Sequence, residues 1–163
     1  SARCHAPEGK APMGPKLSLA ALLLLAASAP ALAAGEPRVI GTDFVVWIAQ
    51  KDGTELSRST TTVPYLPGRA CFGWILEIEN APDFLALRET LQLPGPAGSW
   101  GAPGSTVSPD STAAKTDRIL TPDDGRVGSR WCLVEGDPLG QHRIDISVKD
   151  WLRESFEFEV VAP

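Results

Sequence analysis

The sequence has few of the side chains on which most catalytic and metal sites depend. Its 163 residues include only two histidines, three cysteines and one methionine. It contains no G-x-S-x-G motif, the strained turn that carries the nucleophile of many hydrolases. The two later cysteines and one distant histidine fall short of the four ligands that a structural zinc site needs. We therefore expect no metal, no cofactor and no recognisable catalytic set.

Clusters of basic side chains are also missing. Of fifteen basic and twenty acidic residues, three basic ones (Arg3, Lys10, Lys16) and one acid (Glu8) precede residue 34, which leaves a net charge of −7 after it. Phosphate backbones and anionic lipid surfaces are bound by grouped lysine and arginine. The charge pattern therefore predicts neither a nucleic-acid partner nor electrostatic docking on a membrane.

The one long apolar run lies near the start of the chain. Residues 17–29 are mostly leucine and alanine, they follow Met13 and Lys16, and the small pair Ala31 and Ala33 comes next. This order is typical of a cleavable signal peptide, and the run is shorter than the roughly 20 residues that span a bilayer. We expect residues 1–12 to be an upstream segment, residues 13–33 a signal peptide, and residues 34–163 one periplasmic or secreted domain without stable membrane insertion.

Apolar residues recur at every second position along most of that domain. Ile144, Ile146 and Val148 alternate with polar residues, and a similar alternation follows around Phe156 and Phe158. Less regular runs cover residues 39–50, 55–63, 70–79, 85–93, 118–120 and 129–135. Period-two alternation marks strands with one buried face, and many short strands separated by turns favour an antiparallel sandwich. We predict an all-β domain of about six to eight strands.

One segment breaks the pattern. Residues 94–116 are rich in glycine, proline, serine and alanine, with little to bury beyond Trp100 and Val107. A connection of this length is usually either functional or mobile. We expect a long mobile loop here.

Cys71 and Cys132 are the only cysteines after the leader, and each lies in an expected strand beside a tryptophan. An exported protein folds in an oxidising compartment, so an even cysteine count predicts a disulfide. The alternative is two buried free thiols packed as small hydrophobic groups. Two strand cysteines about sixty residues apart near tryptophan resemble the bridge of immunoglobulin-type sandwiches. That resemblance implies an antiparallel immunoglobulin-like β-sandwich, although Arg130 stands where an antibody domain has its tyrosine.

A broader resemblance covers most of the domain. The segments at residues 71–74 (CFGW), 93–96 (LPGP), 136–142 (GDPLGQH) and 156–158 (FEF) are similar to those of small exported bacterial immunoglobulin-like domains of unknown function. The resemblance implies the fold and no particular activity.

Five tryptophans are many for a domain of this length. Trp47, Trp74 and Trp131 fall within expected strands and are predicted to lie in the core. Trp100, in the long loop, and Trp151, after a turn, are candidates for exposure. Exposed aromatic rings stack on sugars or anchor a partner protein. Trp100 and Trp151 are therefore candidates for a binding surface.

His142 and Asp137 complete the candidate binding surface. A histidine can act as a general base, and Asp137 lies five residues before it in a glycine-bounded turn. The leading hypothesis is nevertheless an exported, non-catalytic binding or protein-interaction module with an unknown protein or glycan partner in the cell envelope. The alternatives are a carbohydrate-binding domain for envelope glycans and a small hydrolase that uses His142.

Overall fold

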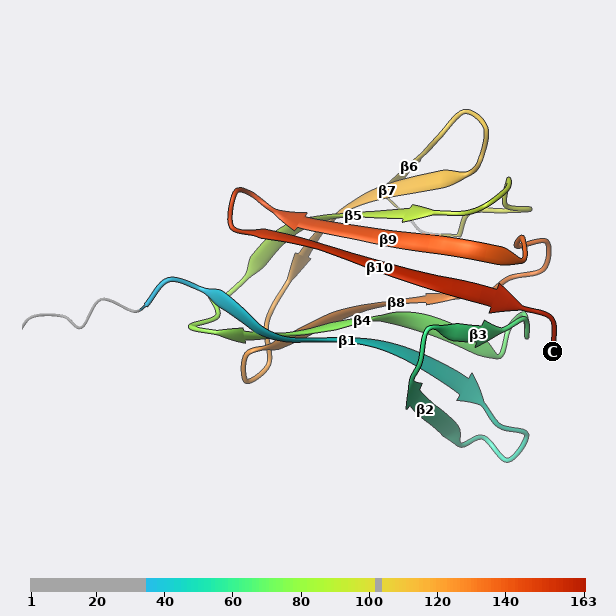
Figure 1. The fold of residues 1–163 in the computed structure, drawn as a ribbon, viewed down its shortest axis with the longest axis horizontal. Helices are drawn as coiled ribbons and strands as arrows, with labels where there is room; N and C mark the ends of the chain where they lie inside the picture. The colour runs from blue at the N-terminus through green and yellow to red at the C-terminus, as the bar shows by residue number, and fades with distance from the viewer. Residues whose placement is uncertain (1–34, 102–103) are drawn as a thin grey trace, which may run out of the picture. The chain divides into compact units, whose positions relative to one another are not determined.

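Two β-sheets form the part of the chain that the structure describes. The structure is a computed structural model and describes residues 35–101 and 104–163. One sheet has the order β2-β1-β4-β8, and the other has the order β3-β10-β9-β5-β7-β6 (Figure 1). All pairings are antiparallel except that of β3 with β10. The predicted all-β sandwich is confirmed, whereas the expected signal peptide and upstream segment lie outside the described residues.

Most strands agree with the alternation of the sequence, but the strand expected over residues 129–135 begins and ends three residues earlier. The first sheet is formed by β1 (Arg38–Ala49), β2 (Glu55–Ser59), β4 (Ala70–Glu79) and β8 (Arg126–Cys132). The second is formed by β3 (Thr62–Pro64), β5 (Leu85–Gln92), β6 (Ser105–Val107), β7 (Ala113–Leu120), β9 (Gly140–Val148) and β10 (Leu152–Val161). In the described residues no helix has the length and apolar character needed to cross a lipid bilayer.

The hydrophobic core lies between the two sheets. In β4, Trp74 and Leu76 are fully buried, and they belong to the same core cluster as Ile144 of β9 and Phe158 of β10 from the other sheet. Successive side chains of a strand point to opposite faces, so each sheet contributes every second residue to this layer. Burying such large apolar side chains is the main favourable term that holds the two sheets together.

The described residues form ten strands, more than the six to eight expected. The single strand predicted over residues 55–63 divides into β2 in one sheet and β3 in the other. All residues of β2 are exposed, whereas Val63 of β3 is fully buried. The chain changes sheets at residues 60–61 because only Val63 in this segment enters the core.

The prediction of a long loop at residues 94–116 is wrong for the second half of that segment. Strand β6 and the first four residues of β7 lie within it and pair as a hairpin. Its turn is closed by Asp110, which accepts hydrogen bonds from the backbone N–H and hydroxyl of Thr112. The inward positions of β7 begin with the small residue Ala114, which is fully buried. Small inward residues concealed the strand, because they give almost no hydrophobic alternation.

The predicted disulfide joins Cys71 and Cys132, but its place differs from that of an immunoglobulin bridge. The two cysteines face each other on the neighbouring strands β4 and β8 of one sheet rather than across the two sheets. The backbone N–H of Leu133 donates to the carbonyl of Ala70 at 3.0 Å, so the cysteines occupy a non-hydrogen-bonded pair of the ladder. The bridge therefore fixes the edge strand β8 to β4.

Trp47 lies on the outer face of the first sheet, contrary to the expectation that it is in the core. It is half-buried beneath the guanidinium of Arg130, whose Cζ lies 4.9 Å from the ring centroid. Arg130 extends from β8 to an ion pair with Glu55 of β2. It passes Gly73, where an added Cβ would lie 1.9 Å from the backbone oxygen of Ser129. The approach of β8 to β4 at this point thus requires glycine.

Candidate functional site

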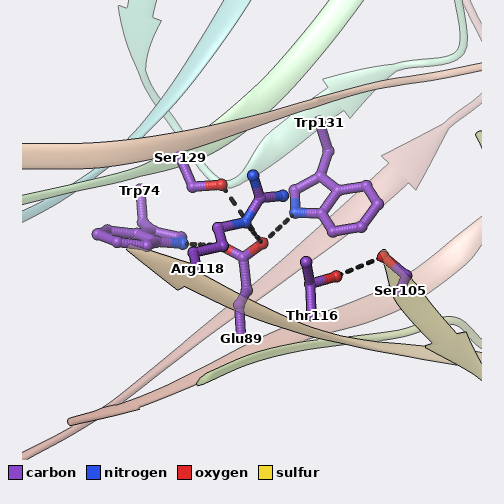
Figure 2. A network of polar contacts seen from close by, with 7 residues as sticks. All are labelled: Trp74, Glu89, Ser105, Thr116, Arg118, Ser129 and Trp131. Atoms are coloured by element: carbon purple, nitrogen blue, oxygen red, sulfur yellow. Dashed lines mark hydrogen bonds and ion pairs between the residues drawn. The ribbon is translucent and has the colours of Figure 1, made fainter. Parts of the chain in front are cut away.

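A fully buried carboxylate, that of Glu89, lies between the two sheets. Its Oε2 accepts a hydrogen bond from Trp74 Nε1 at 2.5 Å. Its Oε1 accepts hydrogen bonds from Trp131 Nε1 at 2.8 Å and from Ser129 Oγ at 3.3 Å. The Nε–H of Arg118 also donates to Oε1 at 3.1 Å, and the two side chains form an ion pair (Figure 2). Four donors therefore converge on one carboxylate.

The Glu89 network connects strands from both layers of the sandwich. Glu89 in β5 and Arg118 in β7 belong to the six-stranded sheet, whereas Trp74 in β4 and the pair Ser129 and Trp131 in β8 belong to the other. A buried charge is tolerated only when an opposite charge and hydrogen-bond donors satisfy it. The network therefore fixes the orientation of Trp131 and Arg118 relative to the core.

A pocket of about 390 Å³ opens beside this network. Its volume lies within the range of small-molecule sites, which is roughly 300–1,000 Å³. Strands β7 and β8 and the connection after β5 form most of its wall. The lining residues are Phe72, Leu91, Leu93, Ser99, Trp100, Gly101, Thr116, Arg118, Arg130, Trp131, Cys132, Leu133, Val134, Asp137 and His142.

Two tryptophan rings form one corner of the pocket. The ring centroids of Trp100 and Trp131 lie 6.4 Å apart, and the planes are inclined at 84°. Trp100 Nε1 donates to the backbone oxygen of Ser111 at 3.2 Å, and Trp131 Nε1 donates to Glu89. Because both indole N–H groups are bonded within the protein, the rings offer a bound molecule mainly apolar carbon surface.

His142 forms part of the wall from β9. It is 3% exposed and stacks on Phe158, with the ring centroids 5.1 Å apart. Nδ1 lies 2.8 Å from the carbonyl oxygen of Gly140, which can only accept, so Nδ1 carries the proton. Nε2 is buried and has no hydrogen-bond partner among the described residues. Burial lowers the pKa of His142 from its ordinary value of 6.5, and the ring is therefore neutral near pH 7.

Asp137 lies beside His142 without bonding to it. Its Oδ2 accepts a hydrogen bond from the backbone N–H of Val134 at 2.9 Å, and burial raises its pKa. No described serine donates to His142, so the described residues show no hydrogen bond between a nucleophile and a base of the kind that a hydrolase uses. The described residues also contain no group of three or more metal-ligating side chains.

The buried histidine predicts a pH-dependent stability. Because its pKa is lower in the folded domain, the unfolded chain binds a proton on His142 more readily, and the domain should lose stability as the pH falls below about 6.5. His142→Phe, which keeps a ring against Phe158, should remove this part of the pH dependence. Urea unfolding of both proteins between pH 7.5 and pH 5.5 measures the difference. An equal loss of stability in both proteins would contradict the prediction.

Three of the four residues proposed from the sequence as a binding surface line this pocket. They are Asp137 and His142, which lie five residues apart, and Trp100, which comes from the distant connection after β5. Trp151 is not among the lining residues and packs half-buried against the core between β9 and β10. Trp100 likewise folds back on the domain. The structure thus gathers one part of the predicted surface and leaves Trp151 apart.

Sequence reasoning missed Glu89, Arg118 and Trp131 as parts of the site. A signal was present at Glu89, where a carboxylate interrupts the inward series Leu85, Leu87 and Leu91. Nothing in the sequence indicated its partners, because Arg118 and Trp131 follow it by 29 and 42 positions.

Comparisons with known proteins concern the fold. A family model described as "PM0630 beta sandwich domain" matches residues 42–161. An immunoglobulin-like protein (PA1606) from Pseudomonas aeruginosa is similar over 79% of this chain and 99% of its own, with 19% identity and a TM-score of 0.53. The PmoD soluble domain from Methylocystis sp. aligns over 76% of this chain and 96% of its own, but 16% identity and a TM-score of 0.35 are too low to support an inference. No curated protein matches significantly.

Proposed function

The chain belongs to the PM0630 beta sandwich domain family, which is described by its fold, and from this premise we propose that the domain is a non-catalytic binding module that acts outside the cytoplasm. The site of binding is the pocket beside Glu89. Its partner is a small molecule or part of a protein or glycan of the cell envelope. The leader-like segment at residues 13–33 and the disulfide support an extracytoplasmic location.

The observation that carries the proposal is the fixed orientation of the pocket wall. Trp131 is held by Glu89 and Trp100 by the Ser111 carbonyl, so both rings keep their positions in the absence of a ligand. A wall that is already ordered loses little conformational entropy when a ligand binds. Apolar walls with a few convergent polar groups are characteristic of ligand sites.

A glycan remains the second candidate ligand, and the pocket gives it a specific basis. Indole rings pack on the apolar faces of sugars, and Asp137 and Arg118 supply an acceptor and a donor for hydroxyl groups. Arg118 covers one face of Trp131, with its Cζ 5.5 Å from the ring centroid. A sugar would therefore pack on the ring of Trp100 and on the face of Trp131 that Arg118 does not cover.

The test is a fragment screen read by the indole N–H signals of the domain in NMR spectra. Small aromatic compounds, oligosaccharides and soluble peptidoglycan fragments are added at millimolar concentration. We expect binders to shift the signals of Trp100 and Trp131, and Trp100→Ala to weaken binding about tenfold through the lost contact area.

Trp151→Phe is the matched control, because Trp151 is a half-buried tryptophan that does not line the pocket. It should leave every affinity unchanged. Binders that shift Trp151 alone, or a complete absence of binders, would refute the proposal.

A further inference from the structure

We propose that the pocket recognises a carboxylate carried on a flat apolar group, and that Arg118 binds the carboxylate. This inference rests on the proposed binding function and specifies the ligand of the same pocket.

Arg118 binds Glu89 through Nε alone. Of the three guanidinium nitrogens, Nε lies 3.1 Å from Glu89 Oε1, and no described residue accepts a hydrogen bond from either Nη. Figure 2 shows both Nη atoms extending away from Glu89, one of them toward the ring of Trp131. The side chain is 28% exposed and lines the pocket, and its Nη groups are the part of the guanidinium that no described residue binds. A guanidinium whose Nη groups are free presents the fork that matches a carboxylate.

The position of this fork is fixed before any ligand arrives. Glu89 is fully buried and also accepts hydrogen bonds from Trp74, Ser129 and Trp131, so it cannot follow a moving arginine. The Trp131 ring supports the guanidinium from one side. Holding a long side chain in one conformation reduces the entropy that binding would otherwise cost. Glu89 is therefore a positioning residue for Arg118.

A single accessible cation suits an anion of one charge. Arg130 also lines the pocket, but both of its terminal nitrogens already bind Glu55. Asp137 is close by, and residues 34–163 carry a net charge of −7. A phosphate monoester has close to two negative charges at neutral pH and would face this acidic surface with one arginine. A carboxylate matches the available charge better.

The rest of the ligand must be apolar. The walls of the pocket include the side chains of Trp100, Trp131, Leu91 and Leu133. The indole N–H groups of both tryptophans already donate hydrogen bonds within the protein. Rings and other flat groups pack well against indole faces. Two sources share this chemistry, namely a free aromatic or aliphatic acid and the C-terminus of a peptide with an apolar last residue.

The experiment compares probes that differ only in their polar group. Calorimetry and indole N–H shifts measure the binding of 2-naphthoate, 2-naphthamide and 2-naphthyl phosphate to the unmodified domain. We expect 2-naphthoate to bind about tenfold more tightly than the amide, because a charge-assisted pair exceeds a neutral hydrogen bond by about 1.4 kcal/mol. Equal binding of acid and amide, or tighter binding of the phosphate, would overturn the inference.

Two arginine variants test whether Arg118 causes the preference for the acid over the amide. Arg118→Lys keeps the charge that Glu89 requires but removes the fork, and it should abolish most of the preference for the acid. Arg88→Gln is the control, since Arg88 forms an exposed ion pair with Asp117 on the outer face and does not line the pocket. A preference unchanged in Arg118→Lys would also overturn the inference. If Arg118→Lys fails to fold, the comparison of acid and amide in the unmodified domain still tests the role of the carboxylate.

A peptide pair distinguishes the two sources. Ala-Ala-Ala-Phe with a free C-terminus is compared with the same peptide as its amide. Selective binding of the free acid supports a peptide terminus as the ligand, whereas binding of 2-naphthoate without the peptide supports a small acid. If neutral fragments bind at Trp100 and Trp131 while no acid is preferred, the carboxylate inference fails and the proposed binding function stands. If no probe or fragment binds, both fail.

Discussion

Glu89→Leu is expected to destabilise the domain by about 3–5 kcal/mol, the usual cost of removing one partner from a buried ion pair. The change leaves the guanidinium of Arg118 without its counter-ion and the indole N–H groups of Trp74 and Trp131 without acceptors. Each unsatisfied buried donor adds to the cost. Urea unfolding followed by tryptophan fluorescence measures the loss.

Two further variants make this result specific. Gln92→Leu places leucine on the exposed side of the same strand, and its stability should stay within about 0.5 kcal/mol of the unmodified domain. Glu89→Gln keeps the shape and one acceptor oxygen, so its loss should be intermediate. Some buried ion pairs can be replaced by apolar residues without loss of stability. If Glu89→Leu were as stable as the unmodified domain, the pair of Glu89 and Arg118 would belong to this replaceable class. The role of Glu89 in supporting the pocket would then be refuted.

Removal of the disulfide is expected to have an effect of similar size. Cys71 and Cys132 are separated by 61 positions, and closing a loop of that length stabilises a fold by roughly 4 kcal/mol in the chain-entropy model. The variant Cys71→Ala with Cys132→Ala should lose about that much. The unfolding midpoint in urea, measured without reductant, gives the comparison.

Reductant supplies the internal control for this prediction. Dithiothreitol should lower the stability of the unmodified domain towards that of the double variant and leave the double variant unchanged. Equal stability of the two proteins without reductant would contradict the prediction. Because Trp131 and Leu133 flank Cys132 at the end of the edge strand β8, loss of the bridge should also weaken ligand binding at the pocket.

Local sequence pattern was sufficient for most strands. The alternation in residues 70–79 and 141–149 agrees with β4 and β9 to within one residue, because a strand with one buried face needs apolar side chains at every second position. The pattern was insufficient where inward residues are small. In β7 the inward positions include Ala114 and Thr116, and three-residue strands such as β3 and β6 are too short to show a period.

The sequence by itself determined that the described domain is built from strands with one buried face, since that conclusion depends only on the order of apolar and polar residues along each strand. It also singled out Cys71 and Cys132 as a pair. Only the tertiary structure decided that the bridge lies within one sheet, that Trp47 faces outward, and that Trp100, Asp137 and His142 share a pocket. The charge of Glu89 is tolerated in the core because donors from β4, β7 and β8 surround it, and strands that far apart in sequence meet only in the folded chain.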